Sequence, residues 1–77
     1  KNSANYKNPL LSQYTDADMI IVKTLISRFK AKQTQENHDL MITLADKISL
    51  DIKEKYEYHK VTEFLEKVLR DYIILTR

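Results

Sequence analysis

The residues of this chain that could carry chemistry are two histidines and a row of acids. His38 and His59 are far apart in the sequence, and neither has the second histidine four residues away that a helical zinc site of the HExxH type requires. The acids of the middle segment follow the spacing of a solvated helix face: Asp46, Asp51, Glu54 and Glu57. A carboxylate-bridged metal site would instead need a glutamate and a Glu-x-x-His pair on one inward face. We therefore expect a protein that is not an enzyme and that holds no metal or cofactor.

The composition narrows the class of protein further. The chain has 77 residues, enough for one small domain, and it contains no Gly, no Cys and a single Pro. The lack of glycine excludes phosphate-binding loops and dinucleotide fingerprints, and the lack of cysteine excludes a disulfide framework. With 43% hydrophobic and 31% charged residues, the composition is typical of a folded globular domain. No segment resembles a signal peptide or spans a membrane, and we expect a cytoplasmic location.

A basic cluster suggests one alternative function. The formal net charge is only +2, from 13 Lys and Arg against 11 Asp and Glu, but four bases gather between residues 16 and 33. These bases are Lys23, Arg28, Lys30 and Lys32. Such a cluster is typical of a surface that contacts phosphates, so the alternative is a small dimeric DNA-binding domain of a bacterial, phage or plasmid regulator. The other interpretation is a solvated helix face, on which the cations near the C-terminus are stabilised by the helix dipole.

The element that would present this cluster is a helix over residues 16–33. Thr15 is a suitable N-cap, and Asp16 and Asp18 fall in the first turn, where acids are favoured. Apolar residues follow with helical spacing at Met19, Val22, Ile26 and Phe29, and the stripe is widened by Ile21 and Leu25. Residues 1–15, which contain the single Pro, are expected to form a partly ordered N-terminal arm with a short turn.

A second helix is predicted after the polar run that follows residue 33. Thr34 or Asn37 could cap it. Its apolar face is long and consists of Met41, Leu44, Ala45, Ile48, Ile52 and Tyr56. The segment 40–44 also alternates apolar and polar residues, as a short strand does. Since the alternation covers far fewer residues than the helical spacing, we favour the helix.

A third helix is predicted over residues 60–76. Its apolar stripe has heptad-type spacing and consists of Val61, Phe64, Leu65, Val68, Leu69, Tyr72 and Leu75. The same phase, extended backwards, would place Lys47 and Glu54 in the core, so we predict a bend or break near residues 58–60. Because no Gly marks the break, a continuous kinked helix is the alternative.

Part of this pattern has a counterpart in a known family. Residues 61–74, VTEFLEKVLRDYII, resemble the second helix of ribbon–helix–helix DNA-binding proteins, with a Thr near the start, an acid, and apolar positions that end in a Tyr. The resemblance implies that residues 41–45 are the DNA-reading strand and residues 47–56 the first helix. The chain lacks the glycine of the turn between the two helices, and its strand segment has no Lys, Arg or Gln to read bases. We therefore do not assign it to this family.

Apolar residues outside the stripes favour association with another chain. Three short helices cannot cover them all, and a domain of this size without metal or disulfides gains support from a partner. We expect the chain to associate through the third helix with help from the second. The candidate interface residues are Leu65, Leu69, Tyr72, Ile73, Ile74, Leu50 and Ile20. The predicted mechanism is burial of the third-helix residues of this set against a partner helix, in a homodimer or with another helical protein.

The sequence as a whole predicts an all-α domain of three helices over residues 16–77. In this domain a helical hairpin packs with a third helix, and the domain associates into a dimeric bundle. The predicted function is a non-enzymatic protein–protein interaction or oligomerisation module. Since the chain begins at Lys1 rather than Met, we expect it to be a fragment of a larger protein.

Overall fold

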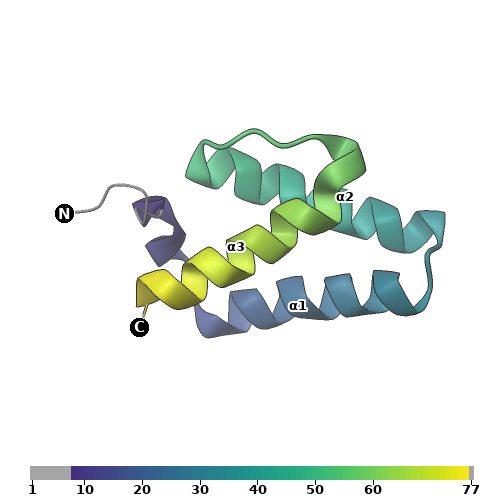
Figure 1. Cartoon of the computed structure of the whole chain (residues 1–77), viewed down its shortest axis with the longest axis horizontal. Coiled ribbons are helices and arrows are strands. Elements are labelled where there is room, and N and C mark those ends of the chain that lie inside the picture. Colours follow the sequence, from purple (N-terminus) through teal and green to yellow (C-terminus); the bar gives the residue numbers. More distant parts are fainter. Residues whose placement is uncertain (1–7, 77) are drawn as a thin grey trace.

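The computed structural model describes residues 8–76, which form helices and the segments that join them (Figure 1). The elements follow in the order η2 (Pro9–Gln13), α1 (Asp16–Ala31), α2 (Gln35–Ile52), η3 (Tyr58–Lys60) and α3 (Val61–Thr76), where η denotes a 3-10 helix. No strand occurs among residues 8–76. The prediction of an all-α fold with three main helices is confirmed.

Both α1 and α2 begin with a side-chain cap. Thr15 and Asp18 form a capping box at the start of α1, in which each side chain accepts a hydrogen bond from the backbone N–H of the other. The Thr34 hydroxyl accepts from the N–H of Asn37 and so caps α2. The predicted cap at Thr15 is confirmed, and of the two candidates for α2 the structure selects Thr34.

The segment before α1 contributes to the same domain. Pro9 occupies the first turn of η2, where its fixed φ angle suits a helix and its missing N–H costs nothing. Leu11 is 1% exposed and belongs to the hydrophobic core. Of the predicted arm, residues 1–7 lie outside the described residues, and residues 9–13 form a turn of helix that packs on α2 and α3.

The second helix ends earlier than its apolar spacing predicts. It stops at Ile52, and Lys53 follows in the left-handed conformation with φ 59° and ψ 40°. The N–H of Lys53 bonds to the carbonyl of Ser49, and the Ser49 hydroxyl donates to the carbonyl of Glu54, which turns the chain away from the helix axis. The placement of Tyr56 on α2 is therefore wrong, and so is the continuous kinked helix.

The alternative strand at residues 40–44 is also wrong, because this segment lies inside α2. The implied correspondence with ribbon–helix–helix proteins fails for the same reason, since its strand segment is helical. The helix is favoured because it places Met41, Ala45, Ile48 and Ile52 together in the core, where each is at most 2% exposed. A strand of five residues would bury only alternate side chains and leave the others in water.

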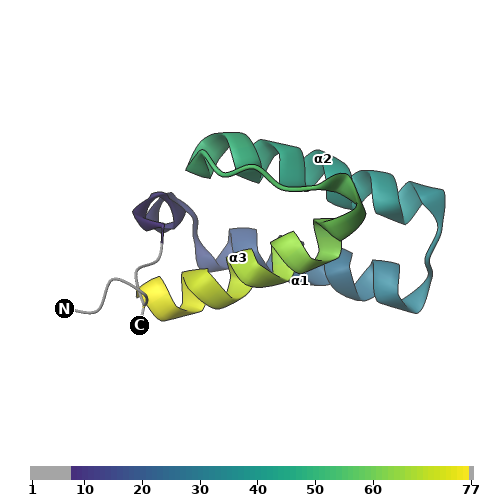
Figure 2. The same cartoon turned by 45° about the horizontal axis from the view of Figure 1, so that its top comes forward.

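Helices α1 and α2 form an antiparallel hairpin, and α3 lies across one face of it (Figures 1 and 2). The connection from Lys53 to Lys60 returns along α2, so α3 runs in the same direction as α2. Within this connection the Tyr56 ring stacks on Phe64 with 4.7 Å between the ring centroids, and its hydroxyl donates to Asp46 over 2.7 Å. These contacts hold the start of α3 against the middle of α2.

The core lies between the three helices and η2. Its buried apolar side chains are Leu11, Met19, Val22, Ile26, Met41, Ala45, Ile48, Ile52, Val61, Phe64, Leu65, Val68 and Tyr72. Each long helix contributes one stripe at three- and four-residue spacing, as the sequence pattern predicts. Because α3 covers only one face of the hairpin, the opposite face has no helix over it within residues 8–76.

Candidate interaction surface

The face of the α1–α2 hairpin that lies away from α3 carries four apolar side chains. Ile21 of α1 and Leu40 of α2 are 54% and 40% exposed. Leu25 and Leu44 lie one helical turn from them and are half-buried against the core. The spacing of four residues places each pair on one side of its own helix. We call these four residues the hairpin face.

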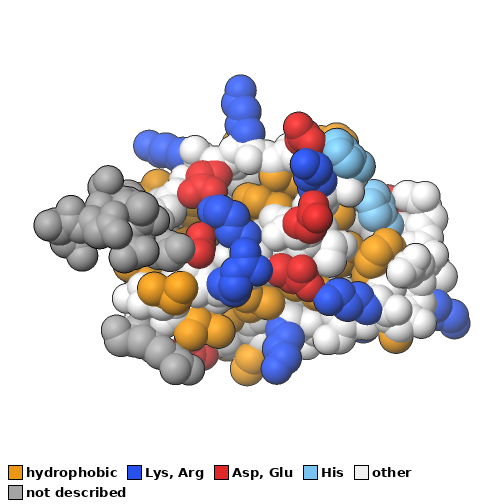
Figure 3. Space-filling model, in the orientation of Figure 1, with side chains coloured by type: hydrophobic (Ala, Val, Ile, Leu, Met, Phe, Trp, Pro, Cys, Tyr) orange, Lys and Arg blue, Asp and Glu red, His pale blue; other side chains and the backbone are white. Residues whose placement is uncertain are grey.

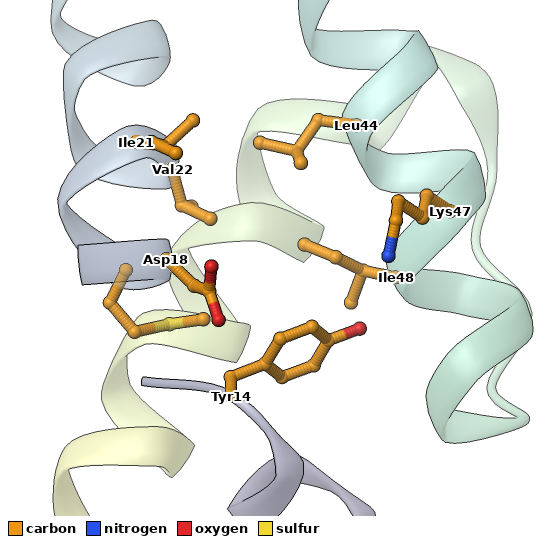
Figure 4. Close-up of a pocket in the computed structure, with 8 residues that line it drawn as sticks. Tyr14, Asp18, Ile21, Val22, Leu44, Lys47 and Ile48 are labelled. Carbon is orange, nitrogen blue, oxygen red and sulfur yellow. The ribbon is translucent and has the colours of Figure 1, made fainter. Parts of the chain in front are cut away.

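A pocket opens in this face between the two helices (Figure 4). Its volume is about 190 Å³, and it is lined by Tyr14, Asp18, Met19, Ile21, Val22, Leu44, Lys47 and Ile48. Figure 4 shows α1 and α2 as its two walls, with α3 passing behind them. Small-molecule sites usually have volumes of about 300–1,000 Å³. The pocket is therefore smaller than a typical small-molecule site.

One end of the pocket holds a hydrogen-bonded set of polar groups. The Tyr14 hydroxyl donates to the Asp51 carboxylate over 2.8 Å, and the Lys47 ammonium donates to the same carboxylate over 3.0 Å. These two hydrogen bonds hold the pKa of Asp51 below its ordinary value. Burial, together with the hydrogen bond to Asp51, raises the pKa of Tyr14 above its ordinary value. At neutral pH the carboxylate is charged and the phenol is neutral, and neither group has the intermediate pKa that suits a general acid or base.

Charges border the hairpin face in the same order on both helices. From N- to C-terminus α1 carries Asp18, Ile21, Leu25 and Arg28, and α2 carries Glu36, Leu40, Leu44 and Lys47. Each helix thus presents an acid, two apolar residues and a base at steps of three or four residues. Because the two helices are antiparallel, the acid of one lies beside the base of the other. Asp18 and Lys47 accordingly line the same pocket from opposite walls.

Several of the side chains predicted to meet a partner lie in the core of the single chain. Leu65 is 0% exposed and Tyr72 is 6% exposed. Tyr72 also donates a hydrogen bond to Asp16 of α1 over 2.9 Å. Leu69 is half-buried against the same core. Within residues 8–76 the stripe of α3 is therefore already packed against α1 and α2.

The remaining predicted interface residues are exposed but do not form one patch. Ile20 and Ile73 are 63% and 44% exposed and lie where the end of α3 meets the start of α1; we call this place the α1–α3 edge. Figure 3 shows hydrophobic side chains gathered there, beside the C-terminal half of α3. Ile74, 56% exposed, is turned about 100° round α3 from Ile73. Leu50, 79% exposed, lies on α2 next to the turn at its end, away from this edge.

The four bases of the nucleic-acid alternative do not share one face of the domain. Lys23 and Lys30 lie two turns apart on the side of α1 that faces α3, and the Lys30 ammonium is 2.6 Å from the Glu66 carboxylate. Arg28 is turned about 160° round the helix from Lys30. Lys32 lies beyond the helix as its C-cap residue. The structure therefore does not gather these bases on one face, and a carboxylate already neutralises one of them.

Neither histidine lies in a constellation that suggests catalysis. The His38 ring lies beside Phe29, with 5.7 Å between the ring centroids, and the exposed His59 lies 3.2 Å from the Glu57 carboxylate. Among residues 8–76 no group of three or more His, Cys, Asp or Glu side chains could hold a metal ion. None of the helices in the same part of the chain is long and apolar enough to cross a membrane.

The hairpin face was missed in the sequence because its residues look like part of the core. Ile21 and Leu25 widen the apolar stripe of the first helix, and Leu44 falls on the face of the second. The usable signal is a second apolar pair at i, i+4 on each helix, beside the buried stripe. That both pairs share one surface follows only from the antiparallel hairpin and from the side on which α3 packs.

Fold and surface together define a small three-helix domain with an open apolar face on its helical hairpin. The chain belongs to the family described as Domain of unknown function (DUF8484), which matches residues 6–77. No curated protein and no solved structure matches the chain.

Proposed function

We propose that the domain is a non-enzymatic protein–protein interaction module that binds a helical partner on its hairpin face. The observation that carries the proposal is the exposure of Ile21 and Leu40 on a two-helix face that α3 leaves open. A groove between two helices is a common receptor for an amphipathic helix, which places apolar side chains at three- and four-residue steps into it. Leu25 and Leu44 form the floor on which such side chains would pack.

The energetics of a small domain support the same proposal. A chain of 77 residues buries a smaller fraction of its surface on folding than a larger one does, so added burial matters more to it. Each Å² of apolar surface removed from water contributes about 25 cal/mol. A partner that covers Ile21 and Leu40 and fills the pocket with a side chain would supply such burial. The charges at the border would then orient the partner.

Site-specific crosslinking in the cells that produce the chain tests this proposal. A photoreactive phenylalanine replaces Ile21 in the hairpin face, and in matched controls it replaces Ile20 or Leu50. Both control positions are more exposed than Ile21, at 63% and 79% against 54%, but lie elsewhere on the surface. We expect protein adducts of defined mass from position 21 and none from the controls. Adducts from position 20 or 50 with none from position 21 would contradict the proposal, as would the absence of any adduct.

A further inference from the structure

The identity of the partner can be inferred from the charges around the hairpin face, and this inference rests on the proposed function. We infer that the hairpin face binds the same face of a second copy of this chain, in a two-fold symmetric arrangement of four helices. An interface between identical surfaces requires a surface that complements itself. The order of acid, two apolar residues and base on both helices meets that requirement.

A two-fold axis parallel to the helices determines which side chains meet. Rotation about this axis moves nothing along the helices, so a residue of α1 meets the residue of α2 that is level with it in its own hairpin. Asp18 and Lys47 are level, because both line one pocket. Asp18 therefore meets Lys47 of the second copy. At the other end of the hairpin, Arg28 meets Glu36 of the second copy by the same rule.

The apolar residues of the hairpin face follow this rule as well. Ile21 and Leu44 line the same pocket, so Ile21 packs on Leu44 of the second copy. Leu25 and Leu40, one turn further along the hairpin, form the next layer. The interface then consists of apolar layers closed at both ends by opposite charges. Every helix also has antiparallel neighbours, which suits the helix dipoles and the packing of four-helix bundles.

A second copy explains features that an unrelated partner does not require. A foreign helix could be bound by an apolar groove with charges in any order. Here the same order occurs twice, on two helices of otherwise different sequence, with Asp18 and Arg28 on one and Glu36 and Lys47 on the other. Like charges brought together at an interface are unfavourable. In this arrangement each of the four charges meets an opposite charge of the second copy.

Sedimentation equilibrium of the purified chain over a wide concentration range tests the inference. We expect a reversible dimer. Arg28→Glu places a carboxylate against Glu36 at two symmetric positions and is expected to weaken the dimer roughly tenfold. Adding Glu36→Lys restores opposite charges across the axis, and we expect the dissociation constant to return to within about threefold of the native value. Both residues are exposed, and circular dichroism of each variant verifies that the helices are intact.

Two further variants separate the hairpin face from the α1–α3 edge. Leu40→Lys is expected to abolish the dimer, and Ile73→Lys, at the edge, is expected to leave it unchanged. A dimer that is lost with Ile73→Lys and kept with Leu40→Lys would overturn the choice of surface. A double variant, Arg28→Glu with Glu36→Lys, that dimerises more weakly than Arg28→Glu alone would overturn the proposed two-fold axis.

The failure of this inference and the failure of the proposed function look different. A purified chain that stays monomeric at every concentration would overturn self-association. Adducts from position 21 in cells would still support an interaction module in that case, with another protein as the partner. A dimer in solution together with position-21 adducts of twice the chain mass would support both.

Discussion

At the scale of single residues, the turn after α2 carries conformational strain. Lys53, with φ 59° and ψ 40°, is the one residue of positive φ among residues 8–76. A side chain with a Cβ atom pays roughly 1–2 kcal/mol for this left-handed region, which glycine adopts freely. Glycine at this position would avoid that cost, but part of the stability gained would be lost because glycine is more flexible in the unfolded chain. We therefore expect Lys53→Gly to raise the free energy of unfolding by about 0.5–1 kcal/mol.

Urea denaturation of the native chain and of this variant measures the difference. Lys55→Gly is the matched control, because Lys55 lies in the same connection and has no positive φ. The control is expected to lower the stability slightly through the added flexibility of glycine. A loss of stability in Lys53→Gly as large as in the control would show that the left-handed turn carries no strain.

The same residue shows where local sequence rules end. The cap at Thr15 and the buried stripe of α1 could be predicted, because a hydroxyl before an acidic turn and apolar residues at helical spacing are local signals. The end of α2 could not be predicted. Its usual signal is a glycine or asparagine just after the last turn, and this position holds Lys53. In the sequence the helical spacing of apolar residues continues to Tyr56. In the structure Tyr56 lies in the connection after α2 and packs on α3.

At the scale of elements, three tyrosine hydroxyls donate to aspartates on other elements. The pairs are Tyr14 with Asp51, Tyr56 with Asp46, and Tyr72 with Asp16. They join the segment before α1 to α2, the connection to α2, and α3 to α1. A hydrogen bond to a charged acceptor contributes more than a neutral one, about 1.5–3 kcal/mol where it is shielded from water and less where it is partly exposed. The tertiary arrangement is thus fixed by polar pairs at its margins as well as by the core.

We expect Tyr56→Phe to lower the free energy of unfolding by about 1 kcal/mol, since it removes the hydrogen bond to Asp46 and keeps the ring stacked on Phe64. Tyr58→Phe is the matched control. Tyr58 lies two residues further along, is 62% exposed, and is expected to change stability little. Chemical denaturation of both variants measures their free energies of unfolding. Equal effects would show that the Tyr56 hydroxyl does not hold the connection.

The order of the three main helices and the limits of α1 and α3 were predictable, but their packing was not. Helices predicted over residues 16–33 and 60–76 correspond to Asp16–Ala31 and Val61–Thr76. The connection that returns along α2, and with it the parallel course of α2 and α3, has no local signal. The face of the hairpin that α3 covers has no local signal either. The hairpin face, and with it the candidate site, therefore follows from tertiary structure that no periodicity in the chain specifies.

At the scale of the whole molecule, these pairs make stability depend on pH at both extremes. Asp51 has a pKa below the ordinary 3.8, because Tyr14 and Lys47 donate to its charged form. A lowered folded-state pKa gives stability that is present above the ordinary value and is lost as the pH falls below it. The tyrosines behave in the opposite sense. Burial and the carboxylates raise the pKa of Tyr14 and Tyr56, and the hydrogen bond to Asp16 raises that of Tyr72, so their contribution is lost at high pH.

We therefore expect the melting temperature to fall steeply once the pH rises above about 10, the ordinary pKa of tyrosine. Above this pH the unfolded chain loses tyrosine protons that the folded chain retains, so unfolding is favoured. Parallel titrations of tyrosinate absorbance and of helical circular dichroism measure the coupling. Tyr14, Tyr56 and Tyr72 are three of the five tyrosines, and their ionisation is expected to coincide with the loss of helix. Ionisation of all five tyrosines while the helices stay intact would contradict the role of these pairs. Tyr72→Phe, which removes one such proton, is expected to make the decline in melting temperature shallower.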